Sequence, residues 1–349
     1  MVGSKRYVAI AMSVAIVAAL GACSEVSHDS GFPELRGDYL GQPLPGDEPE
    51  IFAPGLVTTG LFTRDVAVAP GGDEIYFTIV AGSKSAIMVA RSEDGLWLEP
   101  RVASFSGVWR DFEPFVTAGG DRLLFLSNRP PTNHEPKPGW GYQNIWQVHR
   151  TANGWSEPEI LPAPVNTDGN EFFPSMTAGN TLYFTRGGGG LKAKIFRAKM
   201  TDGGFSEPEE LPAEVNSVES QYNAFVSYDE DLLLFAANGR DDSRGGSDCY
   251  VSFRSPDDIW TGPVNLGDSV NDEGDCDAVS LSPDGRVLFF MSTRRAASDD
   301  GSLRGLTLSE IQARQAAPQN GLADIYWVDA GLLDDRRRAA GELGSSSSG

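Results

Sequence analysis

Eight acidic and amide side chains recur along the chain where they could meet in one binding or catalytic site. They are Asp65, Asp111, Glu113, Glu171, Gln221, Asn223, Asp275 and Asp277. Two or three carboxylates that converge on one pocket can cleave a glycosidic bond as acid and base or nucleophile. Without such a geometry, the same groups form an acidic surface that accepts a peptide, a glycan or a cation. The elements that position them decide between these chemistries.

Each of these residues lies beside a short apolar segment that opens one of five similar units. A tight-turn sequence such as AGGD at 118 or SPDG at 282 follows, and then a strand-like run ending in phenylalanine, at Phe77, Phe125, Phe184, Phe235 and Phe290. Gly, Asn and Asp supply the positive-φ positions that a hairpin needs. A third strand and an aromatic-led fourth strand complete each of the first four units. Four short antiparallel strands repeating about every fifty residues predict a β-propeller blade.

The fifth unit lacks its fourth strand, and the other end of the chain supplies a replacement. PEIFAPGLV at 49–57 is similar to PEILPAPVN at 158–166, which contains a fourth strand. We therefore expect an all-β fold, a five-bladed β-propeller of four-stranded antiparallel blades over residues 49–333. Its ring is closed by an N-terminal strand that completes the last blade. Closure removes the exposed strand edges that an open array would present.

Strand alternation predicts which face of this propeller carries the site. The starts of the innermost strands, the loops between second and third strands, and the crossovers between blades share one face. The eight polar residues should therefore line the rim of the central channel. An insertion at 130–143 brings His134, Trp140 and Tyr142 to the same face, and another at 295–322 contains the helix-like SLRGLTLSEIQARQAA. Variable loops on a rigid scaffold commonly carry binding.

Two further features belong to the same face. Cys249 and Cys276 both begin strands there, so that a disulfide between them and two buried free thiols are both open interpretations. An arginine also recurs after the phenylalanine strand, and we interpret it as blade scaffolding that pairs with Asp248 or Asp324 at the start of a third strand. The recurring arginines are Arg129, Arg186, Arg240 and Arg294.

The last two units carry a family resemblance. The segment 245–294, which includes SPDG, a strand ending in phenylalanine and S-x-R, together with DIYW at 324, resembles the WD40-like (PD40) repeats of TolB-type periplasmic proteins. The resemblance runs through all five units, over about residues 49–330. TolB itself has six blades and an additional N-terminal domain, neither of which is seen here. The resemblance therefore implies the propeller fold and does not carry over a TolB-like partner.

The first residues are typical of an export signal. Lys5 and Arg6 precede an apolar run that ends at Leu20, which is too short to span a bilayer, and the following Gly-Ala-Cys resembles a lipoprotein lipobox. The resemblance implies a signal peptide at 1–22, lipidation of Cys23 and, because Ser24 is not Asp, outer-membrane sorting on the periplasmic side. Residues 23–48 are expected to form a flexible tether and residues 334–349 a disordered tail. The membrane is then contacted through the lipid anchor only.

Composition excludes other classes of function. The chain has 49 acidic against 28 basic residues and a net charge of −21, which disfavours nucleic acid. Three histidines do not supply a zinc site or a Ser-His-Asp triad, so we predict no cofactor and no metal, with calcium at 271–277 left open. The favoured function is a non-catalytic binding module for a protein, peptide or glycan ligand. The alternative is a glycoside hydrolase that uses Asp65, Glu113, Glu171 and Asp275.

Overall fold

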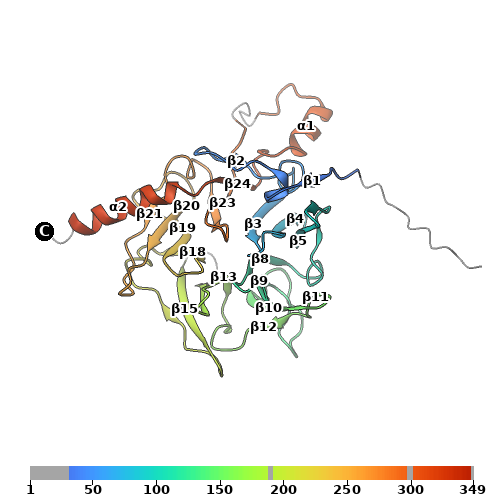
Figure 1. Cartoon of the computed structure of the whole chain (residues 1–349). Helices are drawn as coiled ribbons and strands as arrows, with labels where there is room; N and C mark the ends of the chain where they lie inside the picture. The colour runs from blue at the N-terminus through green and yellow to red at the C-terminus, as the bar shows by residue number, and fades with distance from the viewer. Residues whose placement is uncertain (1–30, 188–191, 297–301, 347–349) are drawn as a thin grey trace, which may run out of the picture. The chain divides into compact units, whose positions relative to one another are not determined.

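The protein forms a ring of five antiparallel sheets, as the predicted five-bladed β-propeller requires (Figure 1). The computed structural model describes residues 31–187, 192–296 and 302–346. From Glu34 onward these residues form one compact unit. The prediction of an all-β propeller with five blades is confirmed.

The five innermost strands surround the axis, one from each blade. In chain order they are β3 (Phe62–Val68), β8 (Asp111–Val116), β13 (Glu171–Met176), β18 (Ser220–Val226) and β22 (Cys276–Leu281). The second strands are β4 (Glu74–Ala81), β9 (Arg122–Ser127), β14 (Thr181–Gly187), β19 (Leu232–Asn238) and β23 (Val287–Ser292). The third strands are β5 (Lys84–Glu93), β10 (Asn144–Thr151), β15 (Ala193–Thr201), β20 (Asp248–Phe253) and β24 (Asp324–Asp329).

The outer strands are short, and in three blades a proline splits them into two pieces. Pro100, Pro158 and Pro208 each separate the halves, because proline has no N–H to donate to the neighbouring strand. The split pairs are β6 (Leu96–Trp97) with β7 (Arg101–Val102), β11 (Gly154–Trp155) with β12 (Glu159–Ile160), and β16 (Gly204–Phe205) with β17 (Glu209–Glu210). The fourth blade ends in β21 (Val264–Asn265).

The hydrophobic core lies in the seams between neighbouring blades. The phenylalanines that end the repeated second-strand motif are all buried: Phe77, Phe125, Phe184, Phe235 and Phe290. Burial of one such ring stabilises the folded state by about 1.5–3 kcal/mol. The repeated motif thus supplies each seam with the same large apolar side chain.

The ring is closed by an exchange of strands, as the sequence predicts. Strand β2 (Glu50–Ile51) pairs antiparallel with β24, with Glu50 opposite Trp327. The next residue, Phe52, is fully buried, and its ring centre lies 5.1 Å from that of Phe289 and 5.0 Å from that of Trp327. The first strand of the propeller therefore completes the last blade.

The prediction of a flexible tether over residues 23–48 is wrong for its described C-terminal part. Strand β1 (Leu35–Arg36) extends the first blade by pairing with β6, and the indole N–H of Trp97 donates to the carbonyl of Gly37 at 2.7 Å. In the 3-10 helix η1 (Tyr39–Gly41), Tyr39 and Leu40 are buried in the seam that contains Phe52. Two apolar side chains are enough to anchor this polar segment. The signal sequence and Cys23 lie outside the described residues.

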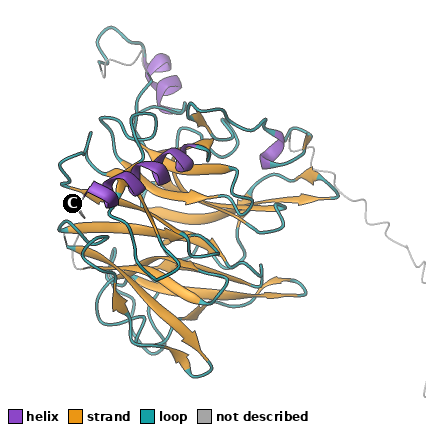
Figure 2. Cartoon of the chain, turned by 60° about the vertical axis from the view of Figure 1, so that its left-hand side comes forward, coloured by secondary structure: helices purple, strands orange, loops and turns teal. Residues whose placement is uncertain are grey.

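The prediction of a disordered tail over 334–349 is also wrong, because helix α2 (Leu332–Ser346) covers most of it. Leu333 and Ala340, seven residues apart and so on one face of the helix, are buried in the core cluster of blades four and five. Arg336 donates to the carbonyl of Leu266 at 2.8 Å. Figure 2 shows this helix lying across the strands.

A second helix, α1 (Leu308–Gln315), forms within the predicted helix-like insertion. Neither helix in the described ranges has the length and hydropathy needed to cross a bilayer.

The closure of the ring predicts a large effect of one substitution. Phe52→Ala leaves a cavity between Phe289 and Trp327, and we expect it to lower the free energy of unfolding by about 3–5 kcal/mol. The matched control is Leu44→Ala, since Leu44 is 38% exposed and its loss should cost less than about 0.5 kcal/mol. Urea denaturation measures both, and equal stabilities of the two variants would contradict the closure.

Candidate functional site

The site is built on a backbone irregularity that recurs in all five innermost strands. In each strand a β-bulge interrupts the pairing with the second strand. One residue of each bulge adopts a left-handed conformation with φ between 50° and 60°, namely Asp65, Glu113, Phe173, Asn223 and Ala278. Such a conformation in a residue other than glycine costs about 1–3 kcal/mol, so the surrounding structure must hold it in place. We call these five the bulge residues.

The residue before each bulge residue is the one that solvent reaches. Its two neighbours in the strand are buried, whereas it is half-buried in every blade. In ring order these side chains are Arg64, Phe112, Phe172, Tyr222 and Asp277, and we call them the funnel ring. Three consecutive blades therefore contribute an aromatic arc, and the remaining two contribute one cation and one anion.

The funnel ring is held together by contacts between blades. The Arg64 guanidinium lies 6.0 Å from the centre of the Phe112 ring. Burial lowers the pKa of Arg64, but the charges of Asp65, then Glu113, then Asp277 more than offset this and raise it. Trp140 from the 130–143 insertion packs on Phe112, with ring centres 5.2 Å apart, and Arg110 lies 5.6 Å from the indole. The aromatic arc thus continues upward onto Trp140.

The carboxyl groups of Asp65 and Glu113 bond each of the first two blades to the next blade. Asp65 accepts from the guanidinium of Arg64 at 2.7 Å and from the backbone N–H of Glu113 at 3.2 Å. Glu113 accepts from the backbone N–H of Phe173 at 2.7 Å and lies 3.7 Å from the Arg64 guanidinium. Both side chains are buried, with at most 6% of their surface exposed. These two groups therefore act as links beneath the funnel ring.

Burial and mutual repulsion perturb the acids of this network. Burial, and then the charge of Asp65, raise the pKa of Glu113 to about 8, although Arg64 and the Phe173 N–H oppose the shift. Burial also raises the pKa of Asp277 to about 6 against the influence of Arg64. One guanidinium faces three carboxyl groups, so Glu113 retains a proton at neutral pH.

Three of the predicted rim residues directly precede a funnel-ring residue in their strand and are fully buried. Asp111 pairs with Arg129 at 2.9 Å, Glu171 pairs with Arg186 at 2.9 Å, and Gln221 bonds the backbone of Val218 through both ends of its amide. These side chains fasten the crossovers between blades. They do not face the funnel, because the bulge places the exposed position one residue later.

In the fifth blade, Cys276 takes the place of these polar residues. It forms a disulfide with Cys249 of the neighbouring blade, with a Cα–Cα distance of 5.6 Å. Both cysteines are buried, and the disulfide links blades four and five covalently, whereas the Asp111–Arg129 and Glu171–Arg186 ion pairs lie within one blade.

The recurring arginines are scaffolding, but the predicted partners are wrong. Each guanidinium packs near the aromatic rings of its own blade; that of Arg129, for example, lies 5.1 Å from Trp146. Their carboxylate partners lie in crossovers, loops or innermost strands, as in the Arg294–Asp272 pair at 3.0 Å. Asp248 and Asp324, the expected partners, instead accept from the backbone N–H groups of Arg244 and Gln319.

The remaining predicted site residues are spread over the same face. Asn223 is a buried bulge residue whose N–H donates to Thr185, and Asp275 accepts from the N–H of Ser247. His134 and Tyr142 bond to backbone carbonyls within their own insertion. Of the three insertion residues, Trp140 alone contacts the funnel ring among the described residues.

The channel is closed below the bulge residues. Phe115 lies 6.0 Å from Phe225 and 5.9 Å from Tyr228, measured between ring centres, and the Tyr228 hydroxyl donates to the carbonyl of Val116. The cavity enclosed there measures about 30 Å³, which is room for about one water molecule. Below the bulge residues the axis is therefore filled by aromatic side chains, and the cavity left among them is small.

Within the described part of the chain, no cluster of three or more His, Cys, Asp or Glu side chains is arranged to hold a metal ion. The fold and the site together define a five-bladed β-propeller in which the partly exposed side chains of the funnel ring surround one end of the axis.

Comparisons with known proteins give no match to a family or a curated protein, and remote similarities to solved structures. Among solved structures, TolB from Acinetobacter baumannii is 12% identical, with a TM-score of 0.44, and covers 77% of this chain. This chain spans only 57% of the length of that TolB.

Two glycan-cleaving enzymes are similar to the same degree. An arabinanase of Bacillus subtilis is 12% identical with a TM-score of 0.48, covering 77% of this chain and 94% of its own. An α-L-arabinofuranosidase of Podospora anserina is 12% identical with a TM-score of 0.43, covering 82% and 94%. At this identity the likeness concerns the fold and does not decide the ligand or the activity.

The sequence analysis missed four of the five funnel-ring residues. It selected polar side chains near the strand starts and passed over Arg64, Phe112, Phe172 and Tyr222. An alignment of the five units would have placed these residues at one equivalent position. It would not have shown that this position faces the axis, because the bulge that follows it leaves no distinct pattern of apolar residues.

The raised pKa of Glu113 predicts a pH dependence of stability. The folded protein binds this proton more tightly than the unfolded chain, whose carboxyl titrates near 4.5. The free energy of unfolding should therefore fall as pH rises from about 4.5 to about 8, and then level off.

Glu113→Gln, which keeps the acceptor but cannot ionise, should lack this part of the decline. Asp277 is present in both proteins, so the difference between the two profiles reports chiefly on Glu113. Urea denaturation between pH 4 and 9 measures the difference, and parallel profiles for the two proteins would show that Glu113 is ionised at neutral pH.

Proposed function

We propose that the chain is an exported, membrane-anchored, non-catalytic module that binds a peptide, protein or glycan ligand in the axial funnel. The observation that carries the proposal is the commitment of Asp65 and Glu113 to structural bonds. Each accepts a backbone N–H of the next blade, and both contact the same Arg64 guanidinium.

This geometry does not suit hydrolysis. A glycoside hydrolase needs two carboxyl groups on either side of the scissile bond, about 5–5.5 Å apart in retaining enzymes and about 6.5–9.5 Å apart in inverting ones. Here a guanidinium occupies the space between the two acids, at 2.7 and 3.7 Å. Displacing it would strand two buried carboxyl groups without their cation, which is costly.

The funnel ring favours a ligand with a flat apolar face and polar edges. Phe112, Phe172 and Tyr222 offer half-buried aromatic surface, and Trp140 extends that surface toward the mouth. Aromatic rings stack on planar or ring-shaped groups such as side chains and sugars. Arg64 and Asp277, on the opposite arc, offer one donor group and one acceptor group to fix the orientation of the ligand.

The proposed location rests on the first residues of the chain. The sequence Leu-Gly-Ala-Cys at 20–23 supports lipidation of Cys23 and attachment to the periplasmic side of a bacterial membrane, with Ser24 favouring the outer membrane. The PD40-like pattern at 245–294 supports kinship with TolB-type repeat proteins. Radiolabelled palmitate incorporated into the wild type and absent from Cys23→Ser would establish the anchor.

A second candidate function, glycoside hydrolysis, is favoured by one observation. With a pKa of about 8, Glu113 carries a proton at neutral pH, as a general acid must, and Asp65 lies beside it. The other two acids of the predicted catalytic set do not join them, since Glu171 is paired with Arg186 and Asp275 bonds Ser247.

Ligand binding can be tested at the mouth of the funnel. A thermal-shift panel of arabino-, xylo- and cello-oligosaccharides and short peptides identifies a ligand, and calorimetry gives its affinity. We expect Trp140→Ala to weaken binding about tenfold, because the indole extends the aromatic arc. Tyr142→Ala, in the same insertion but bonded to Glu135, should bind as the wild type does.

Equal losses in these two variants, or no ligand from the panel, would count against the funnel as the binding site. The same oligosaccharides and their polymers are incubated with the protein and assayed for new reducing ends. We expect none. Release of sugars that disappears in Glu113→Gln would establish the hydrolase instead.

A further inference from the structure

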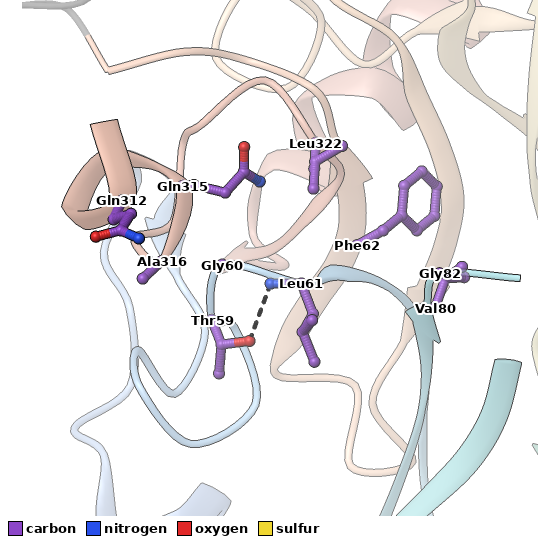
Figure 3. Close-up of a pocket in the computed structure, with 10 residues that line it drawn as sticks. All are labelled: Thr59, Gly60, Leu61, Phe62, Val80, Gly82, Gln312, Gln315, Ala316 and Leu322. Atoms are coloured by element: carbon purple, nitrogen blue, oxygen red, sulfur yellow. Dashed lines mark hydrogen bonds between the residues drawn. The ribbon is translucent and has the colours of Figure 1, made fainter. Parts of the chain in front are cut away.

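A second concave site lies on the funnel face, between the first blade and helix α1. It is a groove of about 720 Å³, a volume within the range of ligand pockets in proteins. Figure 3 shows Gln312 and Ala316 at the helix on one side, Phe62 and Val80 of the first blade on the other, and Leu61 and Leu322 between them. The segments that form it are about 250 residues apart in sequence and meet because the last blade adjoins the first.

The groove is preformed by the backbone. A Cβ on Gly60 would lie 2.6 Å from the Cα of Ala316, so only glycine lets the end of α1 approach this closely. Asn320 donates to the carbonyls of both Gly60 and Gln315, at 3.1 and 2.9 Å. At its other end α1 begins with a capping box between Thr307 and Glu310. The helix has no buried residue, so these contacts fix its position.

The lining of the groove is apolar and uncharged. Leu61 is 43% exposed and Leu322 is 37% exposed, and they stand close together because the N–H of Thr63 donates to the carbonyl of Ala323. None of the ten described residues that line the groove carries a charge, although the chain has a net charge of −21. Adjacent exposed apolar side chains in a concavity mark a binding surface.

Two amides complete the groove. Gln312 and Gln315 are exposed and three residues apart, and therefore project from the same side of α1. A side-chain amide both donates and accepts, which matches the alternating N–H and C=O groups of an extended peptide. Sugar-binding surfaces rely on aromatic platforms, and Phe62 is the one aromatic residue in this lining.

We infer that this groove binds an uncharged peptide segment through a branched aliphatic side chain. The aliphatic side chain packs among Leu61, Val80 and Leu322, while Gln312 and Gln315 bond the peptide backbone. The groove shares no lining residue with the funnel ring, although Phe62 and Phe172 pack against the same buried cluster. Binding in the groove and binding at the funnel ring are therefore tested separately, with different probes and different variants.

The test uses the folded protein with methyl-labelled leucines and a defined probe. The probe is the peptide Gly-Ser-Leu-Ser-Gly with acetylated and amidated ends, titrated to about 10 mM so that a weak complex is detected. We expect saturable shifts of the Leu61 and Leu322 methyl resonances. Peptides with Ser, Asp or Lys in place of Leu should bind at least about tenfold more weakly, because they lose the buried aliphatic group.

Variants separate binding from folding. Leu61→Glu places a charge in the groove and should weaken the leucine peptide at least about tenfold. Leu308→Glu is the matched control, since Leu308 is 71% exposed on α1 and does not line the groove. The inference is overturned if the peptide leaves both methyl signals unchanged, if Leu61→Glu binds as tightly as Leu308→Glu, or if cellopentaose shifts the signals and the peptide does not.

Discussion

The left-handed residue in each innermost strand is the constraint on which the rest of the site depends. A regular strand would alternate its side chains between the two adjoining seams, and both of these are filled with apolar groups. The bulge inserts one residue, so that the side chain before it reaches the axis while its neighbours stay buried. Because the bulge occurs in all five blades, five such side chains surround the axis and form the funnel ring. The bulge residues below it, through Asp65 and Glu113, then bond each of the first two blades to the next.

Closure of the ring holds the bulge residues in their strained backbone conformation. Each strained residue is held by neighbours on both sides, and in an open array the terminal blades would lack one neighbour. The strand at Glu50–Ile51, the buried Phe52 and the docked Tyr39 supply that neighbour between the last and the first blade. Helix α2 and the Cys249–Cys276 disulfide reinforce the seam between blades four and five. The contacts that position the candidate site are therefore also contacts that stabilise the ring.

The sequence predicts the fold well because its signals are local and repeated. Turn sequences such as SPDG, runs ending in phenylalanine, and the similarity of 49–57 to 158–166 each specify one element of the blade. The site is harder to predict, because Asp111 and Glu113 look equivalent in sequence. The bulge between them decides that Asp111 pairs with Arg129 inside its own blade, whereas Glu113 accepts a hydrogen bond from the next blade. The docked segments at Tyr39 and Leu333 escaped prediction because one or two apolar residues in a polar stretch leave no periodic pattern.

The central claim is that Asp65 and Glu113 hold neighbouring blades together and so are not free to catalyse. Amide hydrogen exchange tests it most directly, because the N–H of Phe173 donates to Glu113. The account predicts strong protection of this amide in the wild type and its selective loss in Glu113→Ala, with Leu124 in the second blade still protected. Fast exchange of the Phe173 amide in the wild type, or unchanged protection in Glu113→Ala, would contradict the account.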